Sequence, residues 1–136
     1  MPDASAGRLA ACKRPLNYLL GAVFVVAGIM HFVAPRPFAD VVPRELPRPM
    51  ALVYLSGVAE ILLGLGVVVP RTRRPSAWGL IGLLAAVFPA NVNMAVRDVA
   101  VRGVSYEPAD WMLWARLPFQ GVLVLWAWWY TQPDET

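Results

Sequence analysis

Four long apolar runs, separated by short polar or proline-rich links, make up most of the chain. They cover residues 16–33, 50–69, 76–96 and 111–130, and the only Asp, Glu, Lys or Arg residues inside them are Glu60 and Arg116. A helix needs about 20 residues to cross the hydrocarbon core of a bilayer, and the runs lack the polar alternation of a membrane β-barrel. The pattern predicts one all-α membrane domain over residues 1–136, a bundle of four transmembrane helices.

The residues that flank the runs agree with this division. Prolines, which end helices and stiffen loops, are concentrated in the first link and also bracket the basic turn between the second and third runs. The segment 97–110 is a polar link before the last run. Tryptophans lie near the predicted helix ends, where their rings are expected to anchor in the headgroup region: Trp78, Trp111, Trp114, Trp126, Trp128 and Trp129.

Composition supports a membrane protein. Of the 136 residues, 58% are hydrophobic and 15% are charged, against about 45–50% and about 25% in soluble domains. The net charge of +3 suits anionic lipid headgroups and gives no indication of nucleic-acid binding. The first run is not expected to be a cleaved signal, because a long segment precedes it and no small-x-small site follows it.

Cys12 is the single cysteine of the chain, which excludes dithiol–disulfide chemistry within it. The sequence Leu-Ala-Ala-Cys that ends at this residue is not expected to be lipidated, because no apolar segment precedes it. Cys12 is therefore interpreted as an incidental residue of the N-terminal segment.

Basic residues alone do not decide which way the chain crosses the membrane. Six lie on the side of the N-terminus and of the turn at 70–75, and six lie on the opposite side, so a positive-inside count is tied. The first group clusters tightly at helix ends, and the first helix usually dominates orientation. Arg116, counted in the second group, lies inside a run. We therefore expect an integral inner-membrane (cytoplasmic-membrane) protein with both termini in the cytoplasm.

Polar residues inside the runs are the candidate functional residues, because such groups are costly in lipid and tend to face a cavity. They occur late in the first and third runs and early in the second and fourth, so all of them share one half of the membrane in either orientation. The set comprises His31, Ser56, Glu60, Asn91, Asn93, Arg116 and Gln120. Their common depth predicts a polar pocket near one membrane surface.

Small residues lie on the same helix faces as these polar residues. Gly57 and Gly64 share a stripe with Glu60, and Gly21 and Gly28 lead to His31. On the third run, steps of three and four residues connect Gly79, Gly82, Ala86, Pro89 and Asn93. Because small residues let helices approach closely, we expect tight packing around the pocket.

Each candidate has a structural and a functional interpretation, and the sequence leaves both open. Glu60 is either a hydrogen-bonded carboxyl that specifies packing or a group that binds a ligand or handles protons. His31 is either satisfied by a carbonyl or water, or part of the pocket; a lone His does not make a metal site. Arg116 either snorkels to headgroups, or pairs with Glu60 or with an anionic or carbonyl-bearing ligand. Residues 89–93 are either a broken helix that lines the pocket or a simple helix end.

Four segments resemble, in order, motifs of the DoxX family of small four-helix membrane proteins. They are Ala-Gly-Ile-Met-His-Phe at 27–32, Ser-Gly-Val-Ala-Glu at 56–60 followed by Gly64 and Gly66, Phe-Pro-Ala-Asn-Val-Asn-Met at 88–94, and Arg-Leu-Pro-Phe-Gln at 116–120. The resemblance extends over nearly the whole chain. It implies a four-helix bundle with both ends inside. Some relatives are subunits of thiosulfate:quinone oxidoreductase, and others are linked to methylamine utilisation or redox homeostasis.

The resemblance thus suggests electron transfer to quinone, although the missing cysteine pair argues against a thiol-based role. It implies no catalytic residue, and only the expectation that the matching residues bind a ligand: His31, Glu60, Asn91, Arg116 and Gln120.

Three functions fit the pattern. The first, favoured by the resemblance, is a quinone-interacting subunit of a membrane redox complex, in which His31 and Arg116 donate hydrogen bonds to quinone carbonyls and Glu60 handles protons. The chain has no cofactor motif, so this function requires a redox partner protein, and a homo-oligomer is compatible with it. The alternative is a non-enzymatic binding or scaffold protein for a partner or a small apolar ligand. A proton-coupled transporter is disfavoured at this length unless the chain oligomerises.

Overall fold

The computed structural model describes residues 4–96 and 110–132, and its secondary structure within these ranges is entirely helical. The helices are α1 (Ala4–Val33), α2 (Pro35–Asp40), α3 (Pro49–Val68), α4 (Arg73–Val96) and α5 (Asp110–Trp129). The predicted runs correspond to α1, α3, α4 and α5, with bounds within a few residues of those expected except at the start of α1. The all-α prediction is confirmed for the described residues. The polar link predicted before the last run, with its Arg97 and Arg102, lies outside them.

Two parts of the chain are more helical than the sequence pattern predicts. α1 begins at Ala4 and passes through Pro15, because the segment before the apolar run is rich in Ala, Arg and Lys, which favour helix. In the first link, Pro35 and Pro37 lie in the first turn of α2, where backbone N–H groups have no intrahelical acceptor and proline is tolerated. The prolines therefore separate α1 from α2, but they do not keep the whole link irregular.

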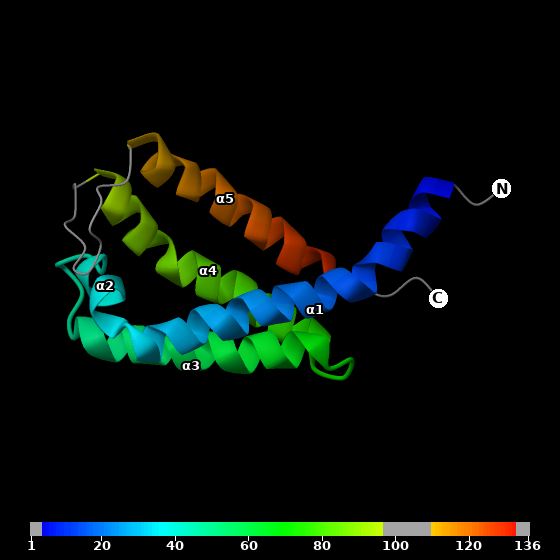
Figure 1. Ribbon diagram of the computed structural model, residues 1–136, viewed down its shortest axis with the longest axis horizontal. Coiled ribbons are helices and arrows are strands. Elements are labelled where there is room, and N and C mark those ends of the chain that lie inside the picture. Colours follow the sequence, from blue (N-terminus) through cyan, green and yellow to red (C-terminus); the bar gives the residue numbers. More distant parts are fainter. Residues whose placement is uncertain (1–3, 97–109, 133–136) are drawn as a thin grey trace.

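The long helices form two pairs that meet at one end of the molecule. α1 packs along α3, and α4 packs on both α3 and α5. Figure 1 shows the α4–α5 pair inclined to the α1–α3 pair, so that the pairs converge towards the chain termini and separate towards the end that carries α2. We call these the terminal end and the α2 end.

Glycines bring α1 and α3 into backbone contact. A methyl group added to Gly28 would lie 2.7 Å from the carbonyl oxygen of Gly57, and one added to Gly21 would lie 2.7 Å from that of Gly64. Only a residue without a Cβ atom allows so close an approach, so the stripes predicted on the first two runs are confirmed. The stripe on the third run is wrong at Gly82, where an added methyl group would have no neighbour within 4 Å.

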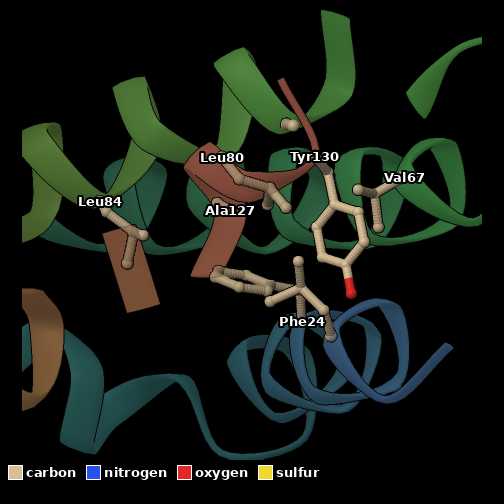
Figure 2. Close-up of a cluster of buried hydrophobic side chains, with 8 residues drawn as sticks. Phe24, Val67, Leu80, Leu84, Ala127 and Tyr130 are labelled. Carbon is tan, nitrogen blue, oxygen red and sulfur yellow. The ribbon is translucent and has the colours of Figure 1, made fainter. Parts of the chain in front are cut away.

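The buried apolar core lies at the terminal end, where the two pairs converge. Figure 2 shows the Phe24 ring and the Tyr130 ring in the space between α1 and the other helices, beside Val67 and Ala127. The cluster comprises Leu20, Phe24, Val67, Ala77, Leu80, Leu84, Ala127 and Tyr130. Every long helix contributes to this core, and Tyr130 directly follows α5.

Polar contacts reinforce the terminal end. The Tyr130 hydroxyl donates a hydrogen bond of 2.8 Å to the carbonyl oxygen of Lys13, and Nζ of Lys13 lies 5.9 Å from the centre of the Trp129 ring, within cation–π range. Nε of Arg73 donates to the carbonyl oxygen of Val67 at 3.2 Å, which satisfies a carbonyl that the end of α3 leaves without a helical donor. These contacts join the end of α5 to the first half of α1 and close the α3–α4 turn.

The remaining apolar side chains of the long helices face outward. In the most apolar windows of α1, α3 and α4, only 28%, 28% and 22% of the residues are buried inside the chain. Within the described part, these three helices are long and apolar enough to cross a membrane, over Ala10–Val33, Pro49–Val68 and Arg73–Asn93. α5 has the length that was predicted for a fourth crossing, but it carries Arg116 and Gln120 and is not among the helices of sufficient apolarity.

Candidate functional site

A cavity of about 340 Å³ lies in the α2 half of the molecule. Its polar lining comes from all four long helices: His31 (α1), Ser56 and Glu60 (α3), Asn91 (α4) and Arg116 (α5). The rest of the wall is mostly apolar, as is typical of small-molecule sites. Four of the five residues predicted to bind a ligand therefore surround one space.

His31 is held by its own helix and by α2. Its Nδ1 atom lies 2.7 Å from the carbonyl oxygen of Ala27, and because a carbonyl only accepts, Nδ1 must carry the hydrogen. The imidazole stacks on the Phe38 ring, with centres 4.0 Å apart and planes inclined by 20°. The other ring nitrogen, Nε2, accepts a hydrogen bond in the neutral ring and donates one in the protonated ring. The predicted satisfaction of His31 by a carbonyl is thus confirmed, together with its place in the pocket.

Glu60 approaches His31 across the contact between α3 and α1. Its Oε2 atom lies 3.0 Å from Nδ1 of His31, yet this buried oxygen makes no hydrogen bond among the described residues. The direction of the N–H bond explains why this short separation is not a hydrogen bond, because Nδ1–H is aligned with the Ala27 carbonyl instead. A buried oxygen without a donor costs about 1–3 kcal/mol. Oε2 is therefore a place where a proton, a water molecule or a ligand hydroxyl would be accommodated.

Gln120 does not line the cavity but packs against Asn91, which does. It is 6% exposed, its Nε2 donates to the carbonyl oxygen of Leu84, and its Oε1 accepts from Nδ2 of Asn91. These bonds tie α5 to α4 and orient the Asn91 amide at the cavity wall. The structure therefore gives Gln120 a positioning role, and it brings Asn91 but not Gln120 to the cavity surface.

The wall formed by α2 and the segment after it was not foreseen from the sequence. Phe38, Val41 and Val42 belong to the proline-rich first link, from which no candidate was taken, and they line the cavity. Their spacing of three and four residues is a helical period and is the signal that could have revealed a shared face. Nδ2 of Asn93 donates to the Val41 carbonyl oxygen at 3.1 Å, which holds this segment against α4.

α4 continues through Pro89 to Val96, so residues 89–93 are neither a broken helix nor a helix end, as the sequence analysis had considered. Proline has no N–H to donate, and the helix is maintained on both sides of this position. Asn91 and Asn93 consequently leave the same helix in different directions, one towards α5 and the other towards Val41. Among residues 4–96 and 110–132, no three His, Cys, Asp or Glu side chains come together as a metal site would require.

The fold and the cavity define a class of protein: in its described residues, a helical chain with three membrane-length apolar helices and, in one half, a cavity whose mostly apolar wall carries a few polar groups. Residues 20–131 match the family described as Domain of unknown function (DUF8561), and the chain belongs to this family. The matched segment contains the apolar core and the whole cavity. Neither a curated protein nor a solved structure matches the chain.

Proposed function

We propose that the chain is a polytopic inner-membrane protein of the DoxX type, whose cavity binds the headgroup of a quinone as a subunit of a membrane redox complex. The observation that carries the proposal is the cavity itself, where a cation, an imidazole and a carboxyl with an unpartnered oxygen meet an apolar wall. The resemblance of the segments at 27–32, 56–60, 88–94 and 116–120 to DoxX motifs supports the choice of ligand.

A fourth crossing by α5 completes the proposed membrane arrangement. α5 has 20 residues, enough to cross the hydrocarbon core. Two of its polar residues contact the rest of the protein, because Arg116, although exposed, borders the cavity and Gln120 is buried against α4. The low apolarity of α5 then reflects the cavity rather than a surface position outside the bilayer.

Charge supports the proposed orientation, with both termini in the cytoplasm. At the terminal end, the described basic residues cluster before the apolar part of α1 and around the α3–α4 turn: Arg8, Lys13, Arg14, Arg71, Arg73 and Arg74. Basic residues next to membrane-spanning helices favour the cytoplasmic side and are attracted by its anionic lipids.

The size and chemistry of the cavity suit a quinone headgroup. A volume of about 340 Å³ lies in the range of small-molecule sites, about 300–1,000 Å³. Arg116 supplies hydrogen-bond donors for a carbonyl oxygen, and Nε2 of His31 can donate to a quinone or accept from a quinol according to its protonation. Oε2 of Glu60 has no hydrogen-bond donor among the described residues and would accept a hydrogen bond from the hydroxyl of a quinol. A redox partner protein supplies or removes the electrons, since the sequence contains no cofactor motif.

Binding of a short-chain quinone to the purified chain in detergent tests the proposal. Glu60→Gln and Arg116→Ala should each weaken binding about tenfold or more, equivalent to about 1.4 kcal/mol, because each removes a group at the cavity wall. Arg71→Ala is the matched control, since Arg71 is exposed in the α3–α4 turn at the other end, and it should bind as the unaltered chain does.

Helical content and thermal unfolding would show that each variant is folded. If the folded, unaltered chain shows no saturable binding, or if Arg71→Ala weakens binding as much as Arg116→Ala, the quinone proposal is wrong. The first outcome would leave the non-enzymatic binding or scaffold function, which pull-down of partner proteins would then examine.

A further inference from the structure

We infer that the cavity exchanges water and protons with one side of the membrane only, the side of the α2 end, and that the apolar core closes it from the terminal side. Each long helix divides at a similar depth into a part that lines the cavity and a part that forms the core. On α1 these parts are His31 and the pair Leu20 and Phe24; on α4 they are residues 86–91 and residues 77–84.

The same division holds on α3 and α5. The cavity is lined by residues 52–60 of α3 and by Arg116 of α5, whereas residues 63–68 and 123–129 belong to the core cluster or pack against it. All four long helices pass from cavity-lining residues to core residues at a similar level. The core is therefore a continuous layer across the molecule, and the cavity lies wholly on one side of it.

This layer is thick and dry enough to stop water. Val68 lies eight positions after Glu60, which corresponds to about 12 Å along the helix. Val67, Leu80 and Ala127 within the layer are 0% exposed. Closely packed apolar interiors contain few spaces large enough for water, and apolar voids stay empty. The core cluster that forms this layer in the described part of the chain is apolar apart from the Tyr130 hydroxyl, so it offers a proton no continuous polar path.

On the terminal side of the layer, polar side chains bond to backbone carbonyl oxygens of that same end. The Tyr130 hydroxyl is bonded to the Lys13 carbonyl, and Arg73 is bonded to carbonyl oxygens at the end of α3. Asn17 is wholly buried, and its two amide atoms make no hydrogen bond among the described residues; it precedes Leu20 and Phe24 on α1 and so lies on the terminal side of the layer.

The described part of the wall on the α2 side is thin by comparison. It comprises Phe38 and, from the segment 41–46, Val41, Val42, Pro43 and Leu46, which are half-buried or exposed. Arg44 and Glu45 of this segment are exposed, so water reaches the outer surface of the wall. The nearest aqueous phase for His31 and Glu60 is therefore the one on the α2 side.

If the cavity binds a quinone as proposed, one-sided access decides from which side of the membrane its protons come. Reduction of one quinone to the quinol takes two electrons from the redox partner protein and two protons, which would come from the α2 side; oxidation would return two protons there. With both termini in the cytoplasm, the α2 side faces outward, and oxidation of a quinol at this site would release its protons outside the cell membrane.

The native cysteine makes a direct test practical. Cys12 is exposed and lies at the terminal end, so it reports one side. In a Cys12→Ser background, Ser56→Cys places a thiol in the cavity with little change of volume, and Ala90→Cys is a second cavity position on another helix. Ala77→Cys, at a wholly buried core position, is the matched control.

A charged, membrane-impermeant maleimide would be added either to spheroplasts or to inverted membrane vesicles. We expect Cys12 to react from one face and both cavity cysteines to react about tenfold or more faster from the opposite face, because the layer between them excludes water. Ala77→Cys should react from neither face until the protein is denatured. Size-exclusion chromatography would confirm that each variant is folded.

Three results would overturn the inference: reaction of the cavity cysteines from the same face as Cys12, equal reaction from both faces, or no reaction from either face in folded protein. The assay contains no quinone. Its outcome is therefore separable from the proposed function. One-sided labelling of a protein that binds no quinone would support the inferred access route and contradict only the proposed ligand.

Discussion

Replacement of Gly28 by alanine should separate α1 from α3. The added methyl group would lie 2.7 Å from the Gly57 carbonyl oxygen and 2.7 Å from Cγ1 of Ile61, whereas ordinary contacts of this kind are 3.4–4 Å. One of the two contacts is to backbone, so the helices themselves must move by several tenths of an ångström. Overpacking of this kind costs about 1–3 kcal/mol.

A matched glycine on another helix isolates this cost. Gly82 of α4 has nothing within 4 Å of an added methyl group, so Gly82→Ala should gain only the better helix propensity of alanine, about 1 kcal/mol. Gly28→Ala gains the same amount, and the propensity term cancels in the comparison. We therefore expect Gly28→Ala to be less stable than Gly82→Ala by about 1–3 kcal/mol.

Reversible unfolding in mixed micelles, followed by far-ultraviolet circular dichroism over a series of SDS mole fractions, would measure this difference. Equal free energies of unfolding for the two variants would refute the reasoning, because they would mean that α1 and α3 do not touch at this level. A Gly82→Ala variant less stable than the unaltered chain would refute it too, since it would show that Gly82 is in close contact with another group.

Two further substitutions test the ties between helices by the same unfolding measurement. Tyr130→Phe removes the hydroxyl that bonds to the Lys13 carbonyl and should destabilise the chain by about 1 kcal/mol, whereas Tyr18→Phe, at an exposed tyrosine, should have little effect; equal effects would contradict the contact. Gln120→Leu removes both bonds that link α5 to α4 and leaves the Asn91 amide without its acceptor, at a cost of about 1–3 kcal/mol; a variant as stable as the unaltered chain would show that this pairing is not formed.

The helices could be predicted from the sequence because their apolar runs are long and their boundaries are marked by proline and charge. The predicted helix boundaries were wrong where a proline did not end a helix as expected. Pro35 ends one helix and also starts another, since the first turn of α2 does not need its N–H. Pro89 reads as a break in the sequence, yet apolar residues on both sides of it continue α4 to Val96.

The candidate site was predictable as a set but not in its internal arrangement. Depth in the membrane follows from position along each run, which is why the sequence groups His31, Glu60, Asn91 and Arg116, and the structure has these four at the wall of one cavity. The direction of a side chain on a helix depends on packing angles that periodicity does not supply, so the burial of Gln120 behind Asn91 could not be foreseen. Phe38 was missed as a wall residue because a six-residue helix is too short to show a pattern.

The glycine contact also explains why His31 and Glu60 meet. In any helix the side chains tilt towards the N-terminus, and α1 and α3 run in opposite directions (Figure 1). His31 follows Gly28 by three residues and Glu60 follows Gly57 by three, so both side chains reach back over the level at which the two backbones touch. A methyl group on Gly57 would lie 2.8 Å from Cβ of His31, in the space this convergence requires. The small residues therefore do more than pack two helices: they leave the room in which an imidazole and a carboxyl from different helices come within 3.0 Å of each other.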